Sequence, residues 1–330
     1  MKALVIKNQH TIEIVEKPRP EPASGQVLVK ILAAALNKRD QFIKEGKYPG
    51  IVPGATLGSD GVGKVIALGA GVPDSLLNKR VVINPNREWG TNEKVQGRDY
   101  NILGMPSDGT FAEYIAVDAD RVHEAPDHLN NAGAAALPLA GLTAYRACFY
   151  HGKITPGNQV LISGFGGGVA QFAFQFALAA GANVYVTSGS EEKLQRATDM
   201  GAAGGFNYKD ADWWKRLPET LKGFDVVIDS AGGNQINDFI RIMNPGGRII
   251  FYGATNGLPS SLDLYRMFWN QITLQGSTMG SDQEFSKMLS FVSDNNIEPV
   301  IDLEYSFDEL ERAFDAIKDA TGAGKIIVNM

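Results

Sequence analysis

The chain has 330 residues, which is long enough for two domains, and its 44% hydrophobic and 21% charged residues are typical of a globular protein. A formal net charge of −6 argues against a broad nucleic-acid surface and against binding to an anionic membrane. The single cysteine, Cys148, excludes an intrachain disulfide and a thiolate zinc site, and it favours the cytoplasm. The N-terminus predicts a strand rather than a signal peptide, and no apolar segment approaches the roughly 20 residues of a membrane span.

The first 125 residues predict a β-rich domain. Short apolar runs are separated by glycine turns, and three prolines at 18, 20 and 22 force an extended connection. This pattern indicates a compact, barrel-like domain. The expected strands are Lys2–Ile6 and Thr11–Val15, which form a hairpin around 8–10, then Gln26–Leu36, Gly61–Leu68, Arg80–Ile83 and Phe111–Val117.

The character of the sequence changes after His123. An Ala-rich stretch, Asn130–Ala147, predicts a helix that Pro138 kinks or breaks. From Gln159 onward short strands alternate with helices, which predicts a parallel, doubly wound sheet. The expected strands are Val160–Ile162, Val184–Thr187, Val226–Asp229, Arg248–Tyr252 and Ile272–Gly276, and the helices are Val169–Ala180, Glu191–Met200, Ala211–Leu221 and Asn234–Met243. Two amphipathic helices, Asp282–Asp294 and Phe307–Ala320, and a last strand, Lys325–Asn329, complete the chain.

One stretch, Asn158–Gly181, joins a buried strand, a glycine turn and a long helix. Gly164, Gly167 and Ala170 approximate the spacing of the dinucleotide fingerprint, in which alanine is accepted last. Free N–H groups and the positive dipole at the start of a helix attract a pyrophosphate. The stretch therefore predicts a dinucleotide site, with a tight turn that binds nothing as the alternative. The expected cofactor contacts here are Gly164, Phe165, Gly166, Gly167, Gly168 and Val169.

The residues after the next predicted strand bear on the choice between NAD and NADP. An NAD site usually has Asp or Glu about 20 residues past the glycine corner, where this chain has Ser188, Gly189 and Ser190. These small residues leave room for a 2′-phosphate, and Lys193 follows one turn later, which favours NADPH. The two glutamates after Ser190 would repel a phosphate if they pointed inward, and otherwise they form the acidic first turn of a helix.

Several motifs, in this order and spacing, resemble the medium-chain dehydrogenase/reductase superfamily. Its zinc-independent quinone and enone reductases and its zinc-type alcohol dehydrogenase-like proteins are the most similar branches. The motifs are LNKRDQFIKEGKYP (36–49), GSDGVGKV (58–65), LPLAGLTAYRA (137–147), LISGFGGGVAQFAFQFA (161–177), DSAGG (229–233), LQGSTMGS (274–281) and GKIIV (324–328). The resemblance implies a GroES-like catalytic domain at 1–127, a Rossmann domain at 128–279 and a return of 280–330 to the catalytic domain.

The resemblance also implies further contacts with the cofactor. Thr143 matches a family position beside the nicotinamide, and Tyr208 matches one near the adenosine end. Other expected contacts follow strands of the predicted sheet, whose carboxyl ends meet ligands, or come from the returning C-terminus. They are Ser230, Gly253, Ala254, Thr255 and Lys325.

Zinc-dependent members of the superfamily hold their catalytic zinc with a cysteine near Asn37, a histidine at Ser59 and a third ligand near Pro138 or Leu139. None of these positions is Cys, His, Asp or Glu here. The lobe that carries a structural zinc in those relatives corresponds to Asn84–Gly104, which contains no cysteine. The ligand chemistry therefore predicts no metal.

Without zinc, alcohol oxidation lacks its Lewis acid, whereas reduction of a polarised C=C bond needs a hydride and donors for the enolate oxygen. Asn37 or Tyr48 could hold that oxygen, Asp40 could orient them, and Tyr48 or water could supply a proton. The structural alternatives are that Asn37 caps a helix over Lys38–Ile43, Asp40 pairs with a neighbouring basic residue, and Tyr48 lines a wall.

These observations predict an NADPH-dependent reductase of a quinone or an α,β-unsaturated carbonyl, with the cofactor between the two domains. The alternatives are a metal-free alcohol/carbonyl oxidoreductase and an NADPH-binding sensor protein with little turnover. Ile272–Met279 would form the exposed edge of the nucleotide-binding sheet, which predicts a homodimer. No nucleic-acid partner and no membrane are expected.

Overall fold

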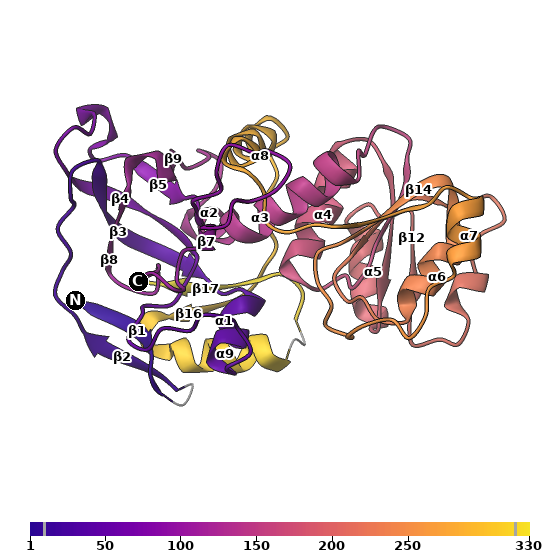
Figure 1. Ribbon diagram of the computed structural model, residues 1–330, viewed down its shortest axis with the longest axis horizontal. Coiled ribbons are helices and arrows are strands. Elements are labelled where there is room, and N and C mark those ends of the chain that lie inside the picture. The colour runs from indigo at the N-terminus through magenta and orange to yellow at the C-terminus, as the bar shows by residue number, and fades with distance from the viewer. Residues whose placement is uncertain (9–10, 320–321) are drawn as a thin grey trace. The chain divides into compact units, whose positions relative to one another are not determined.

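The computed structural model describes residues 1–8, 11–319 and 322–330, which form two compact units (Figure 1). Unit 1 contains Met1–Leu142 and Ser281–Met330, and unit 2 contains Thr143–Gly280. The first unit border thus lies beyond residue 127, because the Ala-rich helix α2 (Asn131–Ala136) packs on strands of unit 1. Residues 9 and 10 of the expected hairpin turn, and residue 320 at the end of the last expected helix, lie outside the described residues.

Unit 1 is built on a sheet whose strands, within the described residues, have the order β16-β17-β3-β4-β5-β9, with β8 also paired to β3. Its strands are β3 (Gln26–Ala35), β4 (Asp60–Leu68), β5 (Arg80–Ile83), β8 (Tyr114–Asp118), β9 (Val122–Glu124), β16 (Ile301–Ser306) and β17 (Lys325–Asn329). Two smaller antiparallel pairs are β1 (Lys2–Ile6) with β2 (Ile12–Glu16) and β6 (Asn86–Arg87) with β7 (Asn101–Ile102). Because β17 lies antiparallel beside β3, the C-terminal strands join the sheet that is built from the N-terminal part of the chain.

Unit 1 also contains helices and short helical turns. They are α1 (Lys38–Lys44), η2 (Asp74–Leu76), η3 (Ala119–Arg121), α2, α3 (Pro138–Tyr145), which runs on into unit 2, α8 (Asp282–Asp294), η6 (Phe307–Glu309) and α9 (Leu310–Asp319). The predicted break at Pro138 is present, and the proline opens α3. A proline is tolerated in the first turn of a helix, where its missing N–H breaks no helical hydrogen bond.

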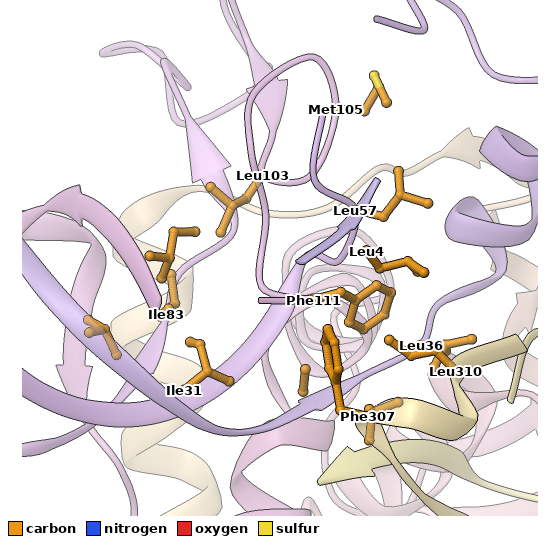
Figure 2. Close-up of a cluster of buried hydrophobic side chains, with 14 of the residues drawn as sticks. Leu4, Ile31, Leu36, Leu57, Ile83, Leu103, Met105, Phe111, Phe307 and Leu310 are labelled. Atoms are coloured by element: carbon orange, nitrogen blue, oxygen red, sulfur yellow. The ribbon is translucent and has the colours of Figure 1, made fainter. Parts of the chain in front are cut away.

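The core of unit 1 gathers apolar side chains from both ends of the chain (Figure 2). Leu4, Phe111 and Phe314 are completely buried, and the last two rings meet edge to face with centroids 6.3 Å apart. Burial of each such side chain stabilises the fold by roughly 1.5–3 kcal/mol. The apolar face of α9 therefore anchors the C-terminal segment in the core of unit 1.

Unit 2 contains a parallel sheet with the strand order β12-β11-β10-β13-β14-β15. Its strands are β10 (Gln159–Ile162), β11 (Asn183–Ser188), β12 (Gly204–Asn207), β13 (Phe224–Asp229), β14 (Met243–Phe251) and β15 (Thr273–Gly276). Its helices are η4 (Arg146–His151), α4 (Gly168–Ala179), α5 (Glu191–Asp199), α6 (Gln235–Ile242) and α7 (Leu264–Trp269). Since the order reverses at β10, the carboxyl ends of β10 and β13 form the switch point where such sheets bind ligands.

The predicted fold class, a Rossmann-type sheet with a barrel-like β domain, is confirmed. The expected helix at Ala211–Leu221 is wrong, because only the short turn η5 (Trp213–Lys215) forms there. Asp212 before it has a left-handed φ of 54°, and Pro218 after it has no N–H to continue a helix. Among the described residues no helix combines the length and the apolar character that a membrane crossing requires.

Candidate active site

The glycine corner of unit 2 links β10 to α4 through a turn that is fixed by β11. Gly164 has a φ of 65°, and its N–H donates to Thr187 Oγ1 at 3.2 Å, while the Phe165 N–H donates to the Thr187 carbonyl at 2.8 Å. Gly167 occupies the N-cap of α4, so Gly168 and Val169 form the first turn of that helix. The Phe165 ring is buried against Phe174, so this side chain packs in the core of unit 2.

The turn after β13 completes this edge of the sheet. Asp229 is fully buried and accepts hydrogen bonds from Ser163 Oγ, from the Gly232 N–H at 2.7 Å and from Gln235 Nε2 at 2.9 Å. Burial raises the pKa of Asp229, although these donors work in the opposite direction. A Cβ on Gly164 would lie 3.3 Å from Ser230 Oγ, which shows that the two turns are in close contact.

The turn after β14 lies against the same loops. A Cβ added to Gly253 would collide with the Ser230 carbonyl oxygen, so this close approach requires glycine. Ala254 lies beside Gly232, and Thr255 is exposed. Thr143, at the start of unit 2, is buried, and its Oγ1 lies 3.6 Å from the Met279 sulfur. The expected cofactor residues around β10, β13 and β14 thus gather at one sheet edge, whereas Thr143 contacts the loop that follows β15.

The predicted 2′-phosphate region is the turn Ser188-Gly189-Ser190 at the end of β11. Ser188 is buried, and its Oγ accepts the Ser190 N–H at 3.3 Å. A Cβ on Gly189 would meet the Tyr208 hydroxyl and Lys209 Cε, each at 2.7 Å, so both side chains lie directly over the turn. Sequence analysis named Tyr208 but missed Lys209, because its contact with Gly189 depends on how β12 pairs with β11.

The two glutamates that follow this turn have separate positions. Glu191 accepts a hydrogen bond from Asn207 Nδ2 at 2.6 Å, so its carboxylate is directed to the end of β12. Ser190 accepts the Lys193 N–H at 3.4 Å and forms the N-cap of α5. Glu191 and Glu192 therefore form the acidic first turn that the macrodipole favours.

In unit 1, three polar side chains from distant parts of the chain meet in a buried cluster. Asn37 Nδ2 donates to Asp60 Oδ2 at 2.8 Å. Lys325 Nζ donates to Asn37 Oδ1 at 2.6 Å and to Asp60 Oδ2 at 2.9 Å. Asp60 Oδ1 accepts the Leu139 N–H at 2.8 Å. The predicted substrate residue Asn37 and the predicted cofactor residue Lys325 are thus direct neighbours, and Asp60 contacts both of them.

Asp40 is the second buried carboxyl of this region. Its Oδ2 accepts the Asn37 N–H at 2.8 Å, and its Oδ1 has no hydrogen-bond partner in the described part of the chain. Burial raises the pKa of Asp40 to about 6, even though the charge of Arg39 and the Asn37 N–H favour the ionised form. The carboxyl therefore changes charge near neutral pH.

Arg39 is a buried cation that contacts Tyr48, and it is not among the residues expected from the sequence. Its guanidinium is buried and donates to Ser59 Oγ and to the carbonyls of Leu103 and Met105. It also lies 4.7 Å from the centre of the Tyr48 ring, with Nε 3.4 Å from the hydroxyl. No sequence signal distinguishes Arg39 from its exposed neighbour Lys38, since only the direction of α1 decides which one points inward.

The residues at the zinc-ligand positions do not fit a zinc ion. Asn37 Oδ1 faces the ammonium of Lys325, and Ser59 Oγ is bonded to Arg39 and to the Leu103 carbonyl. At the third position, the backbone N–H of Leu139 donates to Asp60 Oδ1. In the described part of the chain, no group of three or more His, Cys, Asp or Glu side chains is placed to hold a metal.

A GroES-like sheet unit and a doubly wound sheet with a glycine corner define a nicotinamide-dependent oxidoreductase. Residues 23–127 match the family model of the alcohol dehydrogenase GroES-like domain, and residues 168–294 match that of the zinc-binding dehydrogenases. A zinc-type alcohol dehydrogenase-like protein of Leptosphaeria maculans is 36% identical over 97% of this chain and 94% of its own length. The chain therefore belongs to the medium-chain dehydrogenase/reductase superfamily.

Solved structures agree with this assignment. An NAD-dependent alcohol dehydrogenase is 32% identical and superposes with a TM-score of 0.94, with each chain fully covered. A crotonyl-CoA carboxylase/reductase, solved in complex with NADP, is 25% identical with a TM-score of 0.87, covering all of this chain and 94% of the other. The fold that this chain shares with them binds a nicotinamide cofactor, and the glycine corner and helix start of unit 2 fit its pyrophosphate.

Proposed function

We propose that this chain is a cytoplasmic, zinc-independent reductase that uses NADPH to reduce a quinone or an α,β-unsaturated carbonyl compound. The observation that carries the proposal is the Asn37–Asp60–Lys325 cluster, where an amide stands at one zinc-ligand position and an ammonium contacts the amide oxygen. Such a cluster offers hydrogen-bond donors but no Lewis acid. Donors suffice to stabilise an enolate or a hydroquinone oxygen, whereas alcohol oxidation relies on a metal in zinc enzymes.

The turn around Gly189 supports NADPH as the cofactor. It has no carboxylate to bind a ribose hydroxyl, and Tyr208 and Lys209 lie over it. A hydroxyl and an ammonium suit a 2′-phosphate, which a lysine binds through a charge-assisted hydrogen bond. The related NADP complex supports the same choice, whereas the related NAD-dependent enzyme favours the opposite one.

When bound, NADPH supplies a hydride to the β-carbon of the substrate. The N–H of Asn37 that is not bonded to Asp60 would donate to the carbonyl oxygen of the substrate, on which the negative charge of an enolate would develop. Arg39 orients the Tyr48 hydroxyl. Tyr48 or a water molecule then delivers a proton to the α-carbon.

The test is reduction of a quinone and enone panel by the purified protein, followed as loss of NADPH absorbance, with zinc content measured on the same sample. We expect turnover with NADPH that survives a chelator, and no stoichiometric zinc. Stoichiometric zinc, or turnover of alcohols that a chelator abolishes, would contradict the proposal. Tight NADPH binding without reduction of any acceptor would favour the sensor alternative.

We also propose that the enzyme is a homodimer formed at the β15 edge of unit 2. Within the described residues β15 ends the strand order, and the adjacent α7 exposes an apolar face. Four of its side chains are between 64% and 70% exposed: Leu264, Tyr265, Phe268 and Trp269. Exposed apolar faces beside an open strand edge favour self-association. Sedimentation should give a dimer, and Trp269→Glu should shift it to monomer; a monomeric wild-type protein would contradict the proposal.

A further inference from the structure

Lys325, the first residue of β17, carries an ammonium group that is buried inside unit 1. Only 4% of its side chain is exposed, and its ion-pair partner Asp60 is completely buried. An ammonium in such a place destabilises the fold unless it is paired and hydrogen-bonded. Its contacts with Asp60 and with the oxygen of Asn37 meet that requirement.

These two partners determine which way the Asn37 amide points. An ammonium can only donate hydrogen bonds, and the Asp60 carboxylate, which receives three donors, only accepts them. A flipped amide would place its NH₂ group against the ammonium and its oxygen against the carboxylate. Both contacts would be repulsive, so Oδ1 must face Lys325 and Nδ2 must face Asp60.

The same contacts leave one donor on Asn37 with a fixed direction. An amide NH₂ has two N–H groups, and Asp60 accepts one of them. Because the amide is planar and both of its ends are held, the second N–H cannot rotate away. The ammonium on Oδ1 also polarises the amide, which makes that N–H a stronger donor.

We propose that Lys325 is a positioning residue, whose ammonium, anchored by Asp60, locks the Asn37 amide so that its second N–H is presented to the substrate oxygen. This inference rests on the proposed function and adds to it the origin of the donor geometry. It assigns Lys325 a role through Asn37 rather than through direct contact with the cofactor. The ammonium also occupies the space beside Asn37 Oδ1 and Asp60 Oδ2, so a divalent metal cannot bind these two oxygens.

The first arm of the test follows the Asn37 amide itself, independently of turnover. In protein labelled with ¹⁵N-asparagine, the side-chain NH₂ signals of Asn37 are identified by their loss in Asn37→Asp. We expect Lys325→Met to speed the exchange of these protons with water by about 10-fold or more, since a hydrogen-bonded clamp of 1.4 kcal/mol corresponds to that factor. Lys325→Arg, which keeps a cation, should preserve the signals. Unchanged Asn37 signals in Lys325→Met would overturn the proposal.

Two further variants separate positioning from folding. The double variant Asp60→Asn with Lys325→Met removes both buried charges, so it should fold even if Lys325→Met alone does not, and its Asn37 signals should exchange rapidly. Lys30→Met removes the same charge from an exposed side chain on β3 of the same sheet and should change nothing. Slow exchange in the folded double variant would overturn the proposal.

The second arm measures turnover and cofactor binding together. Removal of a preorganised donor lowers kcat by about 100-fold in comparable sites, so we expect a loss of that order in Lys325→Met, with recovery in Lys325→Arg. The NADPH dissociation constant, from nicotinamide fluorescence, should stay within about twofold, because the positively charged end of Lys325 contacts Asn37 and Asp60. A weakened NADPH affinity with unchanged kcat would overturn the proposal. If the wild-type protein reduces no acceptor, the proposed function fails while the NMR arm still decides the orientation of Asn37.

Discussion

Two buried carboxylates, Asp229 in unit 2 and Asp60 in unit 1, are satisfied in opposite ways. The donors to Asp229 are a hydroxyl, a backbone N–H and a side-chain amide, all of them neutral. Asp60 receives an ammonium as well as an amide and a backbone N–H. Asp229 thus orders the turns around the proposed anion site through neutral donors alone, whereas Asp60 and the Lys325 cation together fix the orientation of the neutral Asn37 amide.

The two units also differ in how far apart in the sequence the residues of each site lie. The proposed anion site of unit 2 is built from the backbone of consecutive residues, Gly164–Val169, with the turn after β13 beside it. The cluster of unit 1 is built from side chains at positions 37, 60 and 325, with a backbone N–H from position 139. The comparison teaches that a cofactor cradle can be local in sequence, whereas an oriented donor needs support from several elements.

The largest effect is expected from breaking the ion pair of unit 1. Asp60→Ala leaves the Lys325 ammonium buried without its counterion, which should lower the free energy of unfolding by about 3–5 kcal/mol. Urea denaturation measures this loss. Asp308→Ala, which removes an exposed partner of Lys2 in the same unit, should leave the denaturation midpoint nearly unchanged. Equal losses of stability in the two variants would show that the buried Asp60–Lys325 ion pair matters no more to the fold than an exposed one.

The next effect tests the cradle of unit 2. Gly167 is an N-cap with a φ of −72°, and a Cβ there would meet nothing closer than 4.0 Å, so Gly167→Asp should fold and even cap α4 well. Its carboxylate would repel a pyrophosphate at the helix start, which should weaken NADPH and NADH binding by about 100-fold or more. Calorimetry measures both affinities. Gly167→Ser, a neutral cap, should lose less, and unchanged binding in Gly167→Asp would place the pyrophosphate elsewhere.

The third effect concerns the pH dependence of unit 1. The folded pKa of Asp40, about 6, lies above the ordinary value of 3.8, so the folded state holds this proton more tightly and loses stability as the pH rises between them. The cost at neutral pH is on the order of 3 kcal/mol, because each pKa unit corresponds to 1.36 kcal/mol. Asp40→Asn should abolish this decline in urea unfolding between pH 4 and 7.

The control for that measurement is Asp99→Asn, which changes an exposed aspartate of the same unit. It should follow the wild-type pH profile. If Asp40→Asn also followed the wild-type pH profile, the Asp40 carboxyl would not be the source of the loss of stability, and another titrating group would be responsible.

The smallest effect sharpens the cofactor choice in unit 2. Loss of a charge-assisted contact with the 2′-phosphate in Lys209→Ala should reduce the preference for NADPH over NADH by about 10-fold. The NADH affinity itself should not change, because NADH lacks that phosphate. Lys222→Ala, an exposed lysine of the same unit, serves as the control. An unchanged NADPH to NADH ratio in Lys209→Ala would show that the 2′-position does not lie over Gly189.

Local patterns were sufficient for most of the fold. The alternation of apolar runs and helical segments after residue 159 predicted the parallel sheet, and Pro138 predicted the break between α2 and α3. The expected helix at Ala211–Leu221 failed because composition there suits a helix, while the backbone turn at Asp212 is set by packing of Trp213 in the core. Propensity is a weak guide where tertiary contacts decide the backbone.

The sequence by itself determined the glycine corner, the acid-free turn after β11 and the lack of zinc ligands at Asn37 and Ser59. These features are residue identities at short spacings, and their chemistry does not depend on distant contacts. Only the tertiary structure decided that Arg39 rather than Lys38 points inward, that Lys209 lies over Gly189, and that Lys325 reaches Asn37. Asn37 and Lys325 are 288 positions apart. No periodicity connects such residues, and the pairing of β17 with β3 brings them together.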